Sequence, residues 1–217
     1  MSINNETFFG RLNARTEFGV GNKIFGLGLS RTGTKSLTKA LNNLRIRTIH
    51  FPHDLTTQME LFSGRGDLTI LECYQGVVDG IAPFYAQLDR ANPDSKFILT
   101  IREKEAWVHS AQIHFTWVAK QFSNFNARFQ EFAQLITERV YGSIDFNRVR
   151  FLDAYEQHVR DVLSYFKERP EQLLVMDITG GDGWEKLCPF VGVPMPLERF
   201  PYILDREKLI DTGLDSC

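Results

Sequence analysis

A strand, a glycine-containing loop and a helix follow one another in residues 23–44. The apolar run KIFGLGL predicts a buried strand over residues 23–29, and Gly33 lies in the loop behind it. From Ser36 onward the apolar residues recur every three or four positions, which predicts a helix to residue 44. This order points a helix N-terminus and several backbone N–H groups at one place. The stretch therefore predicts a site for an anion, usually a phosphate.

Short apolar runs and helical patterns alternate along the rest of the chain. Strands are expected at residues 23–29, 45–50, 68–73, 96–101 and 173–177, and helices at residues 36–44, 53–61, 83–90, 105–121, 125–140, 147–167 and 184–191. The alternation predicts an α/β three-layer sandwich with a mainly parallel five-stranded sheet. In such sheets ligands bind beyond the C-terminal ends of the strands.

Length and charge limit the organisation and the partners of the chain. Its 217 residues are enough for one core, so we expect a single domain over residues 1–217. Residues 1–22 are expected to be peripheral, and residues 194–217 to wrap the surface as a tail. A net charge of -2 gives no global case for binding nucleic acid or an anionic membrane.

The cysteines and the N-terminus predict a soluble cytoplasmic protein. Cys73, Cys188 and Cys217 lie far apart without metal-ligand spacing, which predicts reduced thiols and no metal site. The first residues lack the basic and apolar regions of a secretion signal. No apolar run approaches the roughly 20 residues of a membrane-spanning helix. The sequence leaves the oligomeric state open.

The loop departs from the ATP- and GTP-binding P-loop by one residue. Gly28 and Gly33 have the P-loop spacing, but Thr34 separates Gly33 from the Lys35–Ser36 pair. One inserted residue rotates the lysine and the hydroxyl by about 100° on the helix. Arg31 adds a cation inside the loop, where a nucleotide triphosphatase requires none. These differences argue against an ATP-binding loop.

The segment SRTGTKSL at residues 30–37 instead resembles the 5′-phosphosulfate loop of sulfotransferases that use 3′-phosphoadenosine-5′-phosphosulfate (PAPS). The resemblance implies the P-loop NTPase-like sulfotransferase fold. It also implies that this loop binds the 5′ end of PAPS, through Ser30, Arg31, Thr32, Gly33, Thr34, Lys35 and Ser36.

A second motif strengthens the resemblance. The strand at residues 96–101 is followed by Arg102, and Ser110 lies eight residues later with Trp107 between them. In PAPS sulfotransferases an arginine and a serine with this spacing bind the 3′-phosphate, and Arg102 and Ser110 can offer a guanidinium fork and a hydroxyl. Weaker similarity continues to residue 201. Trp107 itself is expected to lie in the core.

The general base is less clear, because the sequence lacks the T-H-L-P and R-K-G motifs of vertebrate cytosolic sulfotransferases. An alcohol acceptor needs a base within hydrogen-bond reach. Asp79 is favoured, since it follows an expected strand near the position of the family's histidine base. His53 is the next candidate, with His50 behind it. Without a catalytic role, Asp79 would be a turn residue ahead of a helix.

The predicted function is metal-independent, in-line transfer of a sulfuryl group from PAPS to a hydroxyl or amine of a small-molecule acceptor, leaving 3′,5′-diphosphoadenosine (PAP). Arg31 would stabilise the charge that develops on the leaving oxygen. Two alternatives stay open. One is a P-loop kinase for small molecules or nucleosides, with residues 173–177 as its metal-binding strand. The other is a non-catalytic member of the fold that serves as an interaction protein.

Overall fold

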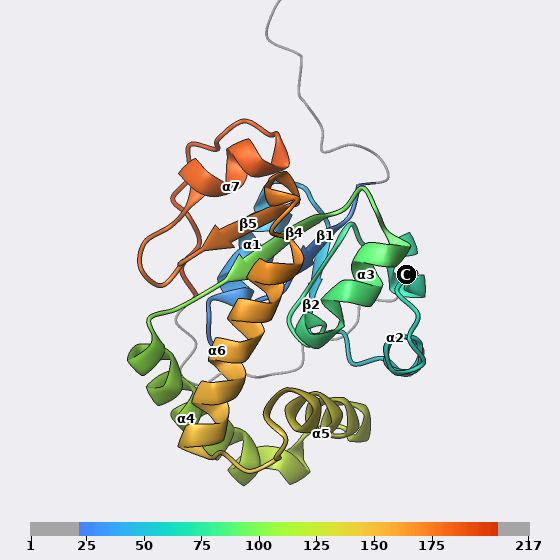
Figure 1. Cartoon of the computed structure of the whole chain (residues 1–217), viewed down its shortest axis with the longest axis vertical. Coiled ribbons are helices and arrows are strands. Elements are labelled where there is room, and N and C mark those ends of the chain that lie inside the picture. Colours follow the sequence, from blue (N-terminus) through green and yellow to red (C-terminus); the bar gives the residue numbers. More distant parts are fainter. Residues whose placement is uncertain (1–21, 204–217) are drawn as a thin grey trace, which may run out of the picture.

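The computed structural model describes residues 22–203 of the chain, and these residues form an α/β sandwich around a five-stranded sheet (Figure 1). The strands are β1 (Ile24–Gly26), β2 (Thr48–His50), β3 (Gly76–Val78), β4 (Lys96–Thr100) and β5 (Leu173–Met176). Their order in the sheet is β2-β3-β1-β4-β5, and every neighbouring pair is parallel. The predicted fold class is confirmed, with a sheet that is parallel throughout.

The helices occupy the segments between and after the strands. They are α1 (Thr34–Asn43), α2 (Leu55–Phe62), α3 (Tyr85–Ala91), α4 (Lys104–Gln121), α5 (Ala127–Tyr141), α6 (Arg148–Tyr165) and α7 (Trp184–Val191), with short 3-10 turns at Thr69–Glu72, Ala82–Phe84, Phe122–Asn124 and Pro170–Gln172. Side chains cap several N-termini, as Asp54 does by accepting a hydrogen bond from the backbone N–H of Thr57 at 2.8 Å.

Two apolar layers cover the two faces of the sheet. Successive strand residues point to opposite faces, so Ile24 packs with α1 and α7 while its neighbour Phe25 packs with the helices on the other face. On that second face the fully buried Phe97 lies against Phe25 and Phe166, with ring centroids 5.5 and 4.7 Å apart. Burial on both faces explains why the strands are continuous apolar runs.

A third apolar cluster lies outside these layers, where α4, α5 and α6 meet. Figure 1 shows α4 and α5 together at one end of the molecule, away from α7. Trp107 is fully buried there and stacks on Tyr155 with ring centroids 4.3 Å apart. This cluster fixes α4, which begins directly after β4, above the ends of the strands.

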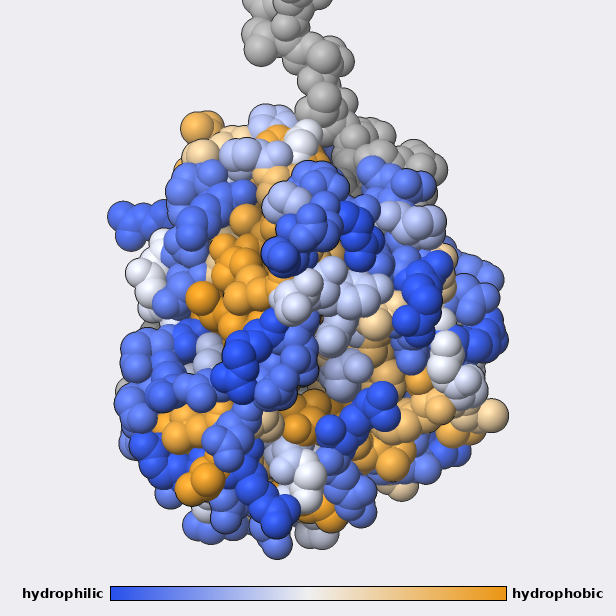
Figure 2. Space-filling view, viewed as in Figure 1, coloured by the Kyte–Doolittle hydropathy of each residue, from blue (hydrophilic) through white to orange (hydrophobic). Residues whose placement is uncertain are grey.

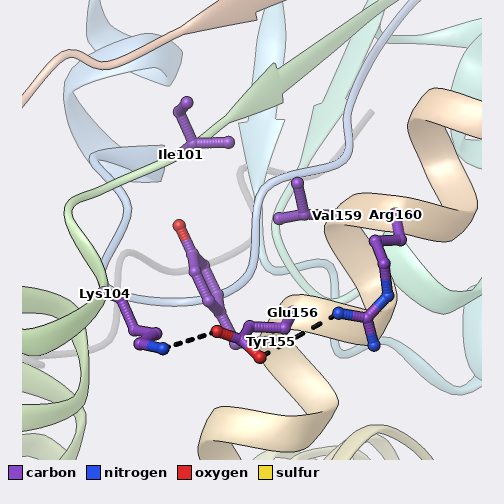
Figure 3. Close-up of a pocket in the computed structure, with 6 residues that line it drawn as sticks. All are labelled: Ile101, Lys104, Tyr155, Glu156, Val159 and Arg160. Atoms are coloured by element: carbon purple, nitrogen blue, oxygen red, sulfur yellow. Dashed lines mark hydrogen bonds and ion pairs between the residues drawn. The ribbon is translucent and has the colours of Figure 1, made fainter.

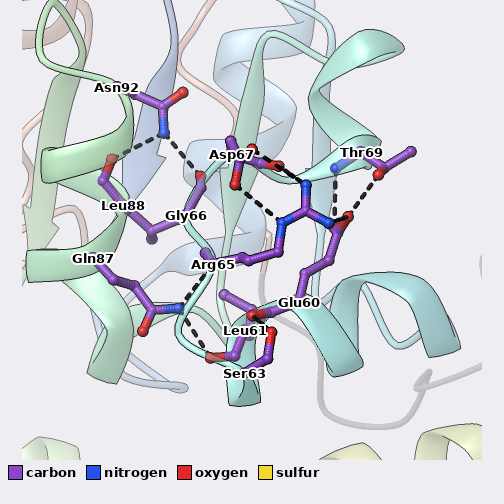
Figure 4. A network of polar contacts seen from close by, with 10 residues as sticks. All are labelled: Glu60, Leu61, Ser63, Arg65, Gly66, Asp67, Thr69, Gln87, Leu88 and Asn92. Carbon is purple, nitrogen blue, oxygen red and sulfur yellow. Dashed lines mark hydrogen bonds and ion pairs between the residues drawn. The ribbon is translucent and has the colours of Figure 1, made fainter.

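The expected strand at residues 68–73 is wrong. This segment contains a 3-10 turn, and the third strand is β3, which starts three residues later. The buried carboxylate of Glu60 accepts hydrogen bonds from the backbone N–H and the hydroxyl of Thr69, at 2.9 and 2.6 Å (Figure 4). Because a side chain takes this backbone donor, the segment cannot offer it to a neighbouring strand.

The described part of the expected C-terminal tail packs on the body of the protein. Trp184 donates its indole N–H to the carbonyl of Glu198 at 2.8 Å, and Phe200 is buried against the same ring. At Ile203 the backbone N–H donates to Ser36 Oγ at 2.9 Å, so the chain reaches the first turn of α1. Residues 204–217 and the expected peripheral residues 1–21 lie outside the described residues.

Cysteine pairing differs from the expectation of reduced thiols. Cys188 is a buried free thiol as predicted, but Cys73 is disulfide-bonded, so the prediction is wrong for Cys73. Cys217 lies outside the described residues. Within residues 22–203, no helix has the length and apolar character needed to cross a membrane. The cytoplasmic location and the single domain over residues 1–217 stay predictions.

Candidate active site

The loop after β1 leads into the N-terminus of α1, where no side chain forms a cap. Gly33 takes the cap position with φ of 97°, a left-handed conformation that glycine adopts without strain. A Cβ there would also lie 3.1 Å from Ile178 Cβ. The first turn of α1 contains no acidic residue and does contain Lys35. Uncapped N–H groups, the helix dipole and a cation together favour a bound anion.

The strand order brings other candidate residues to this loop. Strand β1 lies between β3 and β4, so the segments that follow those two strands flank the loop on opposite sides. Asp79 comes directly after β3, and Arg102 comes two residues after β4. This is the position in an open parallel sheet where ligands bind.

The hydroxyl groups of Thr32 and Ser36 both bond within the protein, Thr32 as a donor and Ser36 as an acceptor. Thr32 is fully buried, and its Oγ1 donates to the carbonyl of Leu29 at 2.7 Å and lies 2.6 Å from Thr100 Oγ1. Ser36 Oγ accepts the hydrogen bond from Ile203. The side chain of Thr32 therefore holds the loop in shape.

The hydroxyls of Ser30 and Thr34 both donate to the carboxylate of Asp79. The distances are 2.9 Å from Ser30 Oγ to Oδ1 and 2.9 Å from Thr34 Oγ1 to Oδ2. Asp79 is only 5% exposed, and it takes φ of 66°, which is unusual for a residue other than glycine. Burial acts to raise the pKa of this carboxyl, but His50 and the two hydroxyls outweigh it and hold the pKa below its usual 3.8.

His50 ends β2 and His53 follows three residues later, and of these two only His50 contacts this carboxylate. His50 Nε2 lies 3.3 Å from Asp79 Oδ2 and 3.1 Å from Thr34 Oγ1. The hydrogen bond of His53 instead joins Nδ1 to the carbonyl of Phe51 at 3.1 Å. Phe51 has φ of 52°, so the chain turns through left-handed backbone after β2 as it does after β3. Strained backbone of this kind collects at functional sites.

Arg31, Arg102 and Ser110 lie together although they come from three separate segments. Arg31 Nε donates to Ser110 Oγ at 3.1 Å, and Arg102 Nη1 donates to the carbonyl of Arg31 at 3.3 Å. Arg31 has φ of 78°, so it is the third non-glycine residue with left-handed backbone in this site, after Asp79 and Phe51. The two anion sites predicted from separate motifs therefore adjoin one another.

The side chains of Trp107 and Tyr155 fix the backbone of this cluster through hydrogen bonds. The indole N–H of Trp107 donates to the carbonyl of Ser30 at 3.1 Å. The hydroxyl of Tyr155 donates to the carbonyl of Arg102 at 2.7 Å and accepts from its backbone N–H at 2.9 Å. The expected core position of Trp107 is confirmed, and its role is to join α4 to the loop.

Residues 23–209 match a protein family described as "Sulfotransferase domain". The chain belongs to the sulfotransferase family. The match includes both motifs on which the resemblance depended, the loop at residues 30–37 and the pair of Arg102 and Ser110. Members of this family are transferases, and the parallel sheet with its helical layers is consistent with the P-loop-like sulfotransferase fold.

Two known proteins extend this comparison. The sulfotransferase chain is 28% identical over 223 residues to "Ava biosynthesis cluster protein M" of Aspergillus versicolor, covering 88% of this chain and 84% of the relative. The crystal structure of a sulfotransferase from Alicyclobacillus acidocaldarius matches with a TM-score of 0.52 and 16% identity, covering 87% of each chain. At that identity the second likeness shows the fold alone.

His114 lies close enough to Arg31 and Asp79 for their charges to act on it, and the sequence motifs did not select it. It lies one helical turn after Ser110 on α4. Burial first and then the positive charge of Arg31 lower the pKa of His114 from 6.5 to about 4, while Asp79 acts in the opposite direction. The imidazole is therefore neutral at pH 7. The sequence did hold one signal for His114, because it lies four residues after Ser110 on an expected helix and so shares a helix face with it.

A separate cavity of about 340 Å³ lies beside the segment that carries Arg102. Its floor is apolar, and Lys104 and Arg160 at its rim both pair with Glu156, at 2.8 and 3.9 Å (Figure 3). Figure 2 shows apolar surface near it, where the edge strand β5 is only partly covered. The cations of this cavity are thus paired with a carboxylate.

Among residues 22–203, no group of three His, Cys, Asp or Glu side chains could hold a metal ion.

Proposed function

We propose that the protein transfers a sulfuryl group from PAPS to a hydroxyl or amine of a small-molecule acceptor, without a metal ion. The observation that carries this proposal is the hydrogen bond between Arg31 and Ser110. It joins a loop suited to a 5′-phosphosulfate to a pair suited to a 3′-phosphate. PAPS carries anionic groups at both of these positions, whereas ATP has no 3′-phosphate.

The residues present fit such a donor. The uncapped N-terminus of α1, Arg31 and Lys35 would bind the 5′ end, with Gly33 allowing the backbone to approach closely. Arg102 and Ser110 would bind the 3′-phosphate. When bound, PAPS supplies a sulfuryl group, whose bond to the 5′-phosphate breaks as the bond to the acceptor forms. Arg31 is suited to balance the charge left on the phosphate oxygen.

We further propose that His50 and Asp79 act together on the acceptor proton. Asp79 is a weak base, because its neighbours hold its pKa below 3.8. Its contact with His50 Nε2 at 3.3 Å favours a proton on that nitrogen and leaves Nδ1 as the acceptor nitrogen of the ring. His50 would then be the general base and Asp79 its positioning partner. His53 is less suited, since its Nδ1 is bonded to a backbone carbonyl.

Thermal-shift measurements with PAP and with AMP test the donor assignment. PAP is expected to raise the melting temperature more than AMP does, because AMP lacks the 3′-phosphate. Arg102→Ala should remove most of that difference, while Arg160→Ala, at the rim of the separate cavity, should preserve it. Equal shifts with PAP and AMP, or no shift at millimolar concentration, would contradict PAPS as the donor. A shift in melting temperature that appears only when Mg²⁺ is present would favour the kinase alternative.

Transfer itself is tested with PAPS and a panel of alcohols and amines, followed by mass spectrometry of the products. At least one sulfated product is expected from the wild-type protein. A protein that binds PAP tightly and yet sulfates no acceptor in a broad panel would support the non-catalytic alternative. Localisation of a tagged chain would test the predicted cytoplasmic location separately.

A further inference from the structure

A run of partly exposed aromatic rings begins next to Gly80, the residue after Asp79. Its members come from the segment after β2, from α4, from the turn before α5 and from α5 itself; they are Phe51, His53, Trp117, Phe125 and Phe129, and we call them the aromatic shelf. Each ring contacts the next, from His53 and Phe51 through Phe129 and Phe125 to Trp117, with centroids 4.5 to 6.4 Å apart. The fully buried Phe132 supports Phe51 from beneath.

The shelf is joined to the pair of His50 and Asp79 at two points. Phe51 follows His50 directly in the chain. A Cβ placed on Gly80, the residue after Asp79, would lie 3.1 Å from Phe51 Cδ2 and 2.9 Å from Phe132 Cε1. Phe51 and Phe132 therefore pack against the backbone that directly follows Asp79, and glycine at position 80 allows this close approach.

Helix α4 joins the shelf to the anion loop. Ser110, His114 and Trp117 follow one another at spacings of four and three residues, so they share one face of the helix. Ser110 contacts Arg31, and Trp117 contacts the shelf. His114 lies between them, and the charges of Arg31 and Asp79 reach it. One helix face thus runs from the proposed phosphate site to the aromatic rings.

A contiguous set of partly exposed rings from three segments is unusual on a protein surface and is typical of ligand sites. Flat rings favour other flat rings, in edge-to-face or offset stacking. We propose that the aromatic shelf is the acceptor subsite and that it selects a small molecule whose hydroxyl is attached to an aromatic ring. This inference rests on the proposed function. In the transfer, the phenolic oxygen forms a bond to sulfur, the bond from sulfur to the 5′-phosphate oxygen of PAPS breaks, and the phenolic proton goes to His50.

The test compares two alcohols of similar size on the PAP-bound protein by calorimetry. 2-Naphthol carries the aromatic rings, and decahydro-2-naphthol is its saturated analogue. Stacking predicts that 2-naphthol binds roughly three- to tenfold more tightly. Phe129→Leu, which keeps apolar volume at the centre of the shelf, should remove that preference. Phe62→Leu is the matched control, an exposed phenylalanine on α2 that contacts Phe84 instead, and it should leave the preference intact.

Equal binding of the two alcohols to wild-type protein would overturn the proposal, as would a preference that survives Phe129→Leu. Tighter binding of N-acetylglucosamine than of 2-naphthol would point to a sugar acceptor and would also overturn it. PAP affinity is measured on the same samples. Intact PAP binding without any preference for 2-naphthol would reject the shelf alone, whereas absence of PAP binding would reject the proposed donor.

Discussion

Arg31 Nε donates a hydrogen bond to Ser110 Oγ at 3.1 Å, although 79 positions of sequence separate the two residues. One lies in the loop after β1 and the other on α4. The contact exists because β1 and β4 are neighbours in the sheet, so the segments that follow them meet. This contact holds the Arg31 guanidinium near the uncapped N-terminus of α1. There it can bind a ligand that carries two anionic groups.

Removal of Arg31 and Ser110 should affect PAP binding in a coupled way. Loss of a hydrogen bond from a charged group costs about 1.5–3 kcal/mol, so Arg31→Ala should weaken PAP binding by roughly 10- to 100-fold. Ser110→Ala should weaken it less. Because the residues touch, the double variant should differ from the sum of the single variants. Calorimetry on the four proteins measures this coupling, with exposed Arg128→Ala as a control; strict additivity would argue against a shared ligand site.

Asp79→Asn should change how stability depends on pH. The pKa of Asp79 in the folded protein is below its usual 3.8, so its carboxylate stabilises the fold above that pH. The contribution disappears as pH falls through the folded value. Asparagine tolerates the left-handed backbone at this position, which limits other effects. The difference in melting temperature between wild type and variant should therefore be largest near neutral pH and should shrink below about pH 4.

The same variant separates a positioning role from a structural one. If Asp79 acts on the acceptor proton through His50, Asp79→Asn should shift the pH profile of transfer as well as lower its rate. His50→Gln should lower the rate and change the shape of the profile, because it removes the proposed base. A profile that keeps its shape in both variants would contradict the assignment of the base.

His114 should make the protein less stable as pH falls from 6.5 toward 4. Its folded pKa of about 4 lies below the ordinary 6.5, so only the unfolded chain binds the proton in that window. The loss has an upper bound of ~3 kcal/mol, and it is reduced because the ring is partly exposed. Urea unfolding at several pH values measures it. His114→Gln should remove this loss, whereas His109→Gln, exposed on the same helix, should keep it.

Thr32→Val should destabilise the loop because it removes a fully buried hydroxyl that bonds Leu29 and Thr100. The expected cost is ~1–3 kcal/mol. Thr32→Ser keeps the hydroxyl and should retain most of the stability. Thr56→Val, at an exposed position on α2, should stay within about 0.5 kcal/mol of wild type. Chemical denaturation distinguishes these outcomes, and equal losses at positions 32 and 56 would contradict the structural role of Thr32.

Patterns local in the chain predict most of the fold. The helical spacing behind Gly33 and the apolar run at residues 96–101 each predict their element, because α1 buries one apolar face and the centre of β4 is buried. The strand expected at residues 68–73 fails for a non-local reason. Its apolar residues are buried as a strand's would be, but Glu60, from the preceding helix, takes the backbone donor of Thr69.

The sequence also predicts only part of the site, because some of its contacts join residues that are far apart in the chain. Arg31, Arg102 and Ser110 stand in motifs with fixed spacing, so their sequence positions are informative. The order of the strands is not visible in the sequence, and this order brings His50 and Asp79 to the hydroxyl of Thr34. The buried partners of Thr32 are likewise set by tertiary contacts. His114 shares a helix face with Ser110, and only the packing of α4 over the loop distinguishes it from any other helix histidine.

Calorimetric titration of PAP into the full chain in the presence of EDTA tests whether the protein binds a PAPS-type donor without a metal ion. We expect saturable binding of PAP that does not change when Mg²⁺ replaces EDTA and that Arg102→Ala weakens. ATP should bind more weakly under both conditions. No binding of PAP, together with Mg²⁺-dependent binding of ATP, would show that the protein is not a PAPS-dependent enzyme.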